Sequence, residues 1–154
     1  MDIRQALPSD AQGISELLRE YARKAMLLPR GAEEIMENIR DFVVAVEGGR
    51  LLGSCALKIY DDTLGEIRSL AVAETGKGRG YGKALMAKCE EDAVRFGLQS
   101  LFALTYIPDF FTHSGYREVD KESLPQKIWR DCCTCINFPN CTEVAVLKRL
   151  HSSP

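Results

Sequence analysis

The sequence predicts a mixed α/β (α+β) domain in which helices flank a mostly antiparallel sheet. Apolar residues recur at helical spacing over residues 14–25 and again over residues 81–93. Between them, residues 42–60 are rich in β-branched and apolar side chains and are interrupted by Gly48 and Gly49, which predicts a β-hairpin. A further apolar run and a glycine-rich stretch then lead into the second long helix, so strands and helices are interleaved along one chain.

Length and composition are those of one ordinary globular domain covering residues 1–154. The chain has 154 residues, of which 45% are hydrophobic and 27% charged. A net charge of -2 argues against a general nucleic-acid-binding protein. No apolar stretch approaches the roughly 20 residues that cross a membrane. The first residues, MDIRQALPSD, lack the apolar run of a signal peptide, so we expect a cytoplasmic protein.

The first third of the chain predicts one strand and two helices. Residues 1–7 have the pattern of a short strand. Ser9 followed by Gln12 is a capping-box pattern and predicts a helix that begins there, with its apolar stripe on a core. Pro29 interrupts the pattern, and residues 32–39 predict a second, shorter helix.

After the hairpin of residues 42–60, the segment DDTLG predicts a turn and residues 66–72 a third strand of this group. The helix that follows the glycine-rich stretch ends at Gly97, a residue type that commonly terminates helices. The remaining predicted elements are a strand at 100–104, a brief helix at 108–115, a strand at 116–119, an irregular segment at 120–141 and a final strand at 142–150.

The stretch GKGRGYGKALM, residues 76–86, predicts an anion site. Glycine lets the backbone take positive φ and approach a ligand without a Cβ atom in the way. The beginning of a helix presents unpaired N–H groups and a partial positive charge, which together bind phosphate. Lys77, Arg79 and Lys83 add positive charge.

Two common phosphate-binding patterns do not fit this stretch. In a P-loop alignment on Gly82 and Lys83, the first glycine falls on Lys77, and Ala84 replaces the hydroxyl that binds magnesium. The Rossmann pattern, G-x-G-x-x-G, places its third glycine on Tyr81 or on Lys83. A flexible basic turn without a ligand is the remaining alternative.

The segment Lys77-Gly78-Arg79-Gly80-Tyr81-Gly82 resembles the Arg/Gln-x-x-Gly-x-Gly/Ala pattern of the GNAT superfamily of N-acetyltransferases, with Lys in the first position. The segments EIRSLAV and FFTHSGY also resemble that superfamily. The resemblance implies a GNAT-like sheet with a pyrophosphate turn between the fourth strand and the third helix. It further implies acetyl-CoA as co-substrate, held by the turn and by the backbone of the preceding strand near Leu70, Ala71 and Val72.

The same resemblance suggests how acetyl transfer is catalysed. Glu66 begins the strand that leads to the turn, where many GNAT enzymes place an acid that takes the proton of the amine. The backbone N–H of Leu70 or Val72 is the expected oxyanion donor. Phe111 stands where the family has its tyrosine acid, so Tyr106 is the candidate substitute.

Over nearly its whole length the chain resembles short amino-acid N-acetyltransferases of the N-acetylglutamate synthase type, on the segments LFALTYIPDFFTHSGY, DKESLPQKIWRDC and NCTEVAV. This implies transfer to the α-amine of L-glutamate, the first step of arginine biosynthesis. Two acceptor carboxylates require cations, and the candidates are Arg30, Lys58, Arg68, Lys127 and Arg130. Arg30 is favoured among them, because the resemblance implies that its bend between two helices, LLPRG, lies over the acceptor site. Arg68 is two residues from Glu66 on a strand, so the two side chains should share a face.

Cys132, Cys135 and Cys141 form an incomplete zinc-ligand pattern, for which Cys133, His113 or His151 would supply a fourth ligand. Reduced or partly disulfide-linked thiols are the favoured interpretation, so no resident metal is predicted. The expected partner is a small amino acid, and a homodimer is one candidate assembly. Two functions remain as alternatives: acetylation of a protein N-terminus or another small amine, and a non-catalytic acyl-CoA-binding module.

Overall fold

In the computed structural model, the described residues are 2–23, 31–125 and 143–150. The strands are β1 (Asp2–Gln5), β2 (Phe42–Glu47), β3 (Arg50–Ile59), β4 (Leu64–Val72), β5 (Ser100–Thr105), β6 (Arg117–Val119) and β7 (Val144–Arg149). The α-helices are α1 (Ala11–Arg23), α2 (Ala32–Glu37), α3 (Tyr81–Arg95) and α4 (Pro108–Thr112). Short 3₁₀ turns are η1 (Pro8–Asp10), η2 (Ile39–Asp41), η3 (Glu74–Gly76) and η4 (Lys121–Ser123).

All seven strands form one sheet in the order β1-β2-β3-β4-β5-β7-β6. Every neighbouring pair is antiparallel except β4 and β5, which run parallel. The predicted hairpin joins β2 to β3 through Gly48 and Gly49, whose φ values of 58° and 77° require glycine-like freedom. The predicted fold class, a mostly antiparallel sheet flanked by helices, is confirmed.

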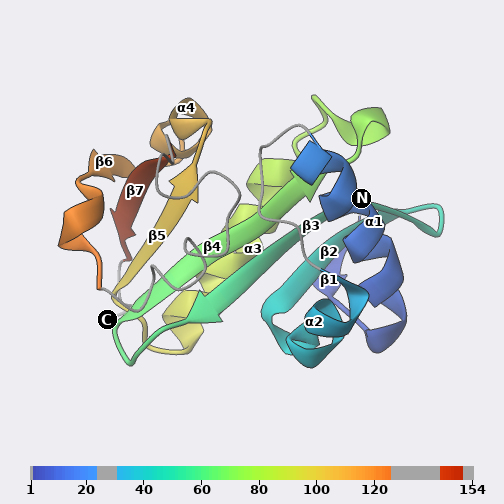
Figure 1. Ribbon diagram of the computed structural model, residues 1–154, viewed down its shortest axis with the longest axis horizontal. Helices are drawn as coiled ribbons and strands as arrows, with labels where there is room; N and C mark the ends of the chain where they lie inside the picture. The colour runs from blue at the N-terminus through green and yellow to red at the C-terminus, as the bar shows by residue number, and fades with distance from the viewer. Residues whose placement is uncertain (1, 24–30, 126–142, 151–154) are drawn as a thin grey trace.

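Helices cover both faces of the sheet (Figure 1). On one face, α3 packs Leu85 and Met86 against strands β2 to β5. On the other, α1 buries Ile14 and Leu18 over β2 and β3. The helix α3 lies close to the sheet at Gly53 of β3. A Cβ atom at this position would lie only 2.8 Å from the Leu85 side chain of α3. Among the described residues, none of the helices is long and apolar enough to span a membrane.

Several predicted boundaries differ from the structure at the ends of elements. The capping box at Ser9 is wrong: the chain turns through η1, and the N–H of Leu7 donates to the Asp10 carboxylate at 2.7 Å. The Asp10 carboxylate also forms an ion pair with Arg4, with 2.8 Å between Oδ2 and Nη1, and this pair holds the carboxylate beside the turn. The second helix ends at Glu37, two residues early, because the chain tightens into η2 before β2.

The strands β4 and β5 lie together only at their beginnings. Their parallel register covers Leu64 to Glu66 on β4, with Glu66 opposite Phe102. Beyond this point the two strands separate toward their ends (Figure 1). The sheet therefore opens between them, and Glu66 occupies the last paired position before the opening.

Candidate acyl-transfer site

A row of charged side chains borders the opening between β4 and β5. Glu66 faces Lys58 directly across the antiparallel pair of β3 and β4, and Arg68 is two residues further along β4. Period-two alternation places Glu66 and Arg68 on the same face of the sheet. Their ion pair, with 3.8 Å between Arg68 Nη1 and Glu66 Oε1, confirms the predicted shared face.

The Glu66 carboxylate is largely withdrawn from solvent and held in place. Its side chain is 9% exposed, and the hydroxyl of Tyr60 donates a hydrogen bond to Oε1 at 3.1 Å. The Tyr60 ring packs on Phe102 with a centroid separation of 5.6 Å, which fixes the phenol beside the carboxylate. A carboxylate withdrawn from water is suited to accept a proton from an incoming ammonium group because burial disfavours its charged form, whereas the neighbouring cations are suited to bind anionic groups.

Tyr60 and Asp41, which the sequence patterns above do not single out, also belong to this region. Tyr60 lies two residues after Lys58 and directly follows β3, so an extension of the period-two alternation could have placed it beside the acid. Asp41 precedes β2, and burial raises the pKa of its carboxyl while the nearby Lys58 charge partly opposes that rise. The Lys58 ammonium also lies 5.7 Å from the centre of the Tyr60 ring.

A β-bulge shapes β4 just beyond the acid. Between the Ser54–Ala71 and Ala56–Arg68 pairs, β4 contains one residue more than β3. Ser69 takes a φ of 56°, which is uncommon for a residue other than glycine. The buried Ser54 hydroxyl donates to the Ser69 carbonyl oxygen at 3.1 Å and stabilises this conformation. Leu70, which with Val72 is one of the two predicted oxyanion donors, directly follows Ser69 in this bulge.

The glycine turn connects η3 to α3. Gly78 and Gly80 have φ values of 78° and 83°, and a Cβ atom built on either would meet nothing within 4 Å. Gly80 is the N-cap of α3 and has no side chain with which to cap it. No side chain therefore covers the backbone at Gly78 and Gly80, where this 15-residue helix begins. The unpaired N–H groups of its first turn fit a diphosphate.

The predicted cations of the turn are not equivalent. Lys77 pairs with Glu74 at 3.1 Å, and Arg79 pairs with Glu47 at 2.8 Å. Lys83 is exposed, and among the described residues no ion pair is formed by it. Tyr81 is 2% exposed and its ring is part of the core, so only its backbone N–H is available to a ligand.

The segment after β5 supplies aromatic packing rather than an obvious proton donor. Phe111 is 4% exposed and contacts Phe110 and Tyr116 edge to face. The Tyr116 hydroxyl donates to Glu90 at 2.8 Å on the α3 side of the sheet. Tyr106 is half-buried immediately after β5 and remains the candidate acid.

Several predicted residues lie outside the part of the chain that the structure describes: Arg30, Lys127, Arg130, Cys132, Cys133, Cys135, Cys141 and His151. His113 is described and exposed. Within residues 2–23, 31–125 and 143–150, the His, Cys, Asp and Glu side chains form no cluster of three suited to a metal ion.

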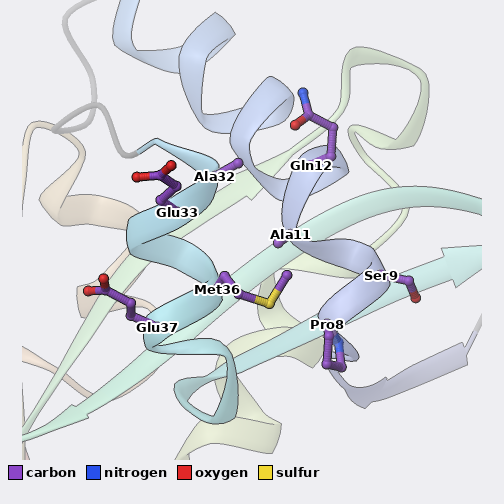
Figure 2. Close-up of a pocket in the computed structure, with 8 residues that line it drawn as sticks. All are labelled: Pro8, Ser9, Ala11, Gln12, Ala32, Glu33, Met36 and Glu37. Atoms are coloured by element: carbon purple, nitrogen blue, oxygen red, sulfur yellow. The ribbon is translucent and has the colours of Figure 1, made fainter.

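A separate pocket of about 460 Å³ lies between η1, the beginning of α1, and α2 (Figure 2). Its lining includes Gln12, Glu33 and Met36. None of its lining residues belongs to the glycine turn or to the Lys58–Glu66–Arg68 row, so it is distinct from the acyl-transfer region.

Comparison with known sequences shows the family of the chain. The model of the acetyltransferase (GNAT) family matches residues 11–118. An uncharacterized N-acetyltransferase of Chlorobaculum tepidum is 43% identical over 148 residues, which are 96% of each chain. An amino-acid acetyltransferase of Mycobacterium tuberculosis is 31% identical over 134 residues, covering 85% of this chain and 76% of its own length.

Comparison with solved structures gives the same family. The chain superposes with a TM-score of 0.89 and 30% identity on N-acetylglutamate synthase from Neisseria gonorrhoeae, complexed with coenzyme A and N-acetyl-glutamate. That match covers 97% of this chain but 35% of the Neisseria protein, so this chain corresponds to about a third of it. Family model, relatives and superposition agree: the chain belongs to the GNAT family of N-acetyltransferases.

Proposed function

We propose that this protein transfers the acetyl group of acetyl-CoA to the α-amine of an amino acid, and that L-glutamate is the acceptor. The observation that carries the proposal is the buried Glu66, bordered by Lys58 and Arg68 at the opening of the sheet. One carboxylate and two cations match an acceptor that brings one ammonium group and two carboxylates. Relatives named amino-acid acetyltransferases support the same substrate class.

Acetyl-CoA would be held in two places. The N–H groups at the beginning of α3, with Gly78 and Gly80 clearing space, would bind the pyrophosphate. The backbone of β4 from Leu70 to Val72 would pair with the pantetheine arm, as an added strand pairs with a sheet edge. The register between β4 and β5 ends at Glu66, so the arm would pair with the edge of β4 beyond that point.

Residues of β4 would then carry out the transfer. Glu66 takes a proton from the acceptor ammonium, directly or through water, and the freed nitrogen bonds to the thioester carbonyl carbon. The Leu70 N–H stabilises the negative charge that develops on the carbonyl oxygen. When that charge returns to the carbonyl, the C–S bond breaks, the nitrogen gives its second proton to solvent to leave the neutral amide, and Tyr106 or solvent protonates the departing thiolate.

Acceptor carboxylates would be bound by Lys58 and Arg68, with Arg30, Lys127 and Arg130 as the further candidates from the sequence. Burial of an unpaired carboxylate costs several kcal/mol, so each acceptor carboxylate needs a cationic or hydrogen-bonding partner. Arginine is the better partner because its planar fork binds a carboxylate through two hydrogen bonds. This set of residues favours a small dianionic acceptor over a peptide N-terminus, as does the similarity to amino-acid acetyltransferases.

The proposal is tested by supplying acetyl-CoA with each amino acid in turn and following the release of free thiol. We expect the highest kcat/KM with L-glutamate and a lower value with glutamine, which lacks the second carboxylate. Equal use of glutamine would contradict the two-cation argument. Thiol release with a peptide but with no amino acid would identify an N-terminal acetyltransferase. Coenzyme A binding without any transfer would identify a non-catalytic acyl-CoA-binding module.

A further inference from the structure

A small hydrogen-bonded network joins the glycine turn to the end of a distant strand. Glu47 is the last residue of β2, Arg79 lies within the turn, and Tyr81 is the first residue of α3. Arg79 Nη2 is 2.9 Å from Glu47 Oε1 and 2.8 Å from Oε2. The Tyr81 hydroxyl donates to Glu47 Oε2, so one carboxylate holds both residues. The Arg79 guanidinium also lies 5.3 Å from the centre of the Tyr81 ring.

This network fixes a segment that has little else to hold it. The described backbone hydrogen bonds of the loops include one from the Lys77 N–H to Glu74 and one from the Ala84 N–H to Gly80. None of those printed for the described residues joins residues 78–79 to another part of the chain. Two glycines at positive φ give this segment wide conformational freedom. A ligand binds a flexible loop less tightly than a preordered one, because part of the binding free energy is used to order the loop.

The network is charged over the ordinary working range of pH. The hydrogen bond from Tyr81 and then that from Arg79 lower the pKa of the Glu47 carboxyl below its usual range. The hydrogen bond between Tyr81 and Glu47 also raises the pKa of the Tyr81 phenol, because the phenolic proton is bound by the Glu47 carboxylate. Glu47 therefore remains a carboxylate and Tyr81 a hydrogen-bond donor near neutral pH.

We propose that Glu47 is a positioning residue of the acetyl-CoA site, which preorganises the glycine turn by holding Arg79 and Tyr81. Glu47 does not touch the cofactor in this view. It sets the direction of the N–H groups at the beginning of α3, so that the pyrophosphate meets one conformation instead of many. The inference rests on the proposed function insofar as that function places pyrophosphate at this turn.

The test is Glu47→Gln, examined by calorimetric titration with coenzyme A and by steady-state kinetics. We expect about tenfold weaker coenzyme A binding and a similar rise in KM for acetyl-CoA, the usual size of a lost charge-assisted hydrogen bond. Because the acyl-transfer residues are untouched, kcat at saturating acetyl-CoA and KM for the acceptor should stay within about twofold. Glu47→Asp, which keeps the charge, should recover part of the affinity.

Asp10→Asn is the matched control, because it also removes a carboxylate paired with an arginine. Asp10 follows β1, whose Gln5 pairs with Val43 at the other end of β2 from Glu47. The control should lose thermal stability but bind coenzyme A as the parent protein does. Parent-like affinity of Glu47→Gln would overturn the inference, as would equal losses of affinity in Glu47→Gln and Asp10→Asn.

Gly80→Val separates this inference from the proposed function. A side chain at Gly80 would enter the space in which the phosphate is expected, so coenzyme A binding should be lost in a folded variant. If Gly80→Val loses binding while Glu47→Gln keeps it, the placement of pyrophosphate stands and the role of Glu47 is wrong. If Gly80→Val binds coenzyme A normally, the placement itself is wrong and the role of Glu47 is wrong with it.

Discussion

Glu66 combines three properties that a proton acceptor in acyl transfer needs. It is buried, it accepts a hydrogen bond from Tyr60, and it lies where β4 and β5 begin to separate. Its burial and the adjacent Arg68 have an alternative explanation, since ion pairs within a sheet also occur for purely structural reasons. The kinetic consequence of removing the charge distinguishes the two explanations.

Glu66→Gln should lower kcat by about a hundredfold or more, the usual contribution of a general base. The amide keeps the size of the side chain but cannot take a proton from the acceptor. The loss should shrink at high pH, where the free amine is already abundant. Measurement of kcat from neutral to alkaline pH checks this, and parent-like turnover throughout would remove Glu66 from the mechanism.

The sequence was informative about single residues wherever local chemistry decided their positions. The shared face of Glu66 and Arg68 follows from strand periodicity alone. The positive φ of Gly78 and Gly80 follows from the glycine pattern of the turn. The pairing of Arg79 with Glu47 joins residues 32 positions apart and could not be read from the local pattern. The roles given to individual site residues remain predictions.

At the scale of elements, β4 is the part of the structure on which the proposed chemistry depends. It pairs with β3 along its length, with β5 only at its beginning, and it contains the bulge at Ser69. The sequence predicted this strand but placed its start at Glu66 instead of Leu64. The bulge was not predicted, because an extra residue within a ladder depends on the partner strand and leaves no local signal.

Ser54→Ala should destabilise the bulge. The buried Ser69 carbonyl would lose its hydrogen bond from Ser54, at a cost of about 1–3 kcal/mol for a buried group left unpaired. Because the bulge positions the Leu70 backbone, kcat should fall while the protein remains folded. Chemical denaturation and steady-state kinetics measure the two effects.

Ser123→Ala is the comparison for this prediction. The Ser123 hydroxyl also donates to a backbone carbonyl, that of Asp120, but in an exposed turn where water can replace it. Its loss should change the free energy of unfolding by less than about 0.5 kcal/mol. Equal and small effects of the two substitutions would show that the Ser54 bond does not hold the bulge.

At the scale of the whole molecule, the sheet consists of two parts that meet over a short length. The strands β1 to β4 form one part and β5, β7 and β6 the other, and only Leu64–Glu66 of β4 pair with β5. On the α3 face, Glu90 accepts from Tyr116 at 2.8 Å and lies 3.3 Å from Lys148 of β7. This cluster links α3 to the second part of the sheet.

The overall architecture could be predicted because periodicity and turn residues agreed along most of the chain. The Glu90 cluster could not, since its members come from α3, from the segment before β6, and from β7. Glu90 belongs to a helical run of charged residues, of which Glu91 is an exposed neighbour. Nothing local to the sequence distinguishes these two glutamates.

Glu90→Ala should lower the free energy of unfolding by about 2–4 kcal/mol, because Tyr116 and Lys148 would lose their partly buried acceptor. Glu91→Ala is the matched control on the same helix and should change stability by less than about 0.5 kcal/mol. Denaturant unfolding of both variants measures the difference. Indistinguishable stabilities would show that the cluster does not join the two parts of the sheet.

The same cluster predicts how the molecule responds to alkaline pH. Burial, and then the Glu90 charge and hydrogen bond, raise the pKa of the Tyr116 phenol above its ordinary value of 10.0. The folded protein therefore keeps the phenolic proton at a pH where the unfolded chain releases it. This contribution to stability is fully present below about pH 10 and is lost progressively above it.

Above about pH 10, stability should fall by about 1.4 kcal/mol per pH unit from this one group. Tyr116→Phe cannot ionise, so it should be less stable than the parent protein at neutral pH but lose less stability between about pH 10 and 11. Denaturant unfolding of the two proteins at a series of pH values gives both slopes. Equal alkaline slopes would mean that Tyr116 ionises as readily in the folded protein as in the unfolded chain, and that the cluster does not hold its proton.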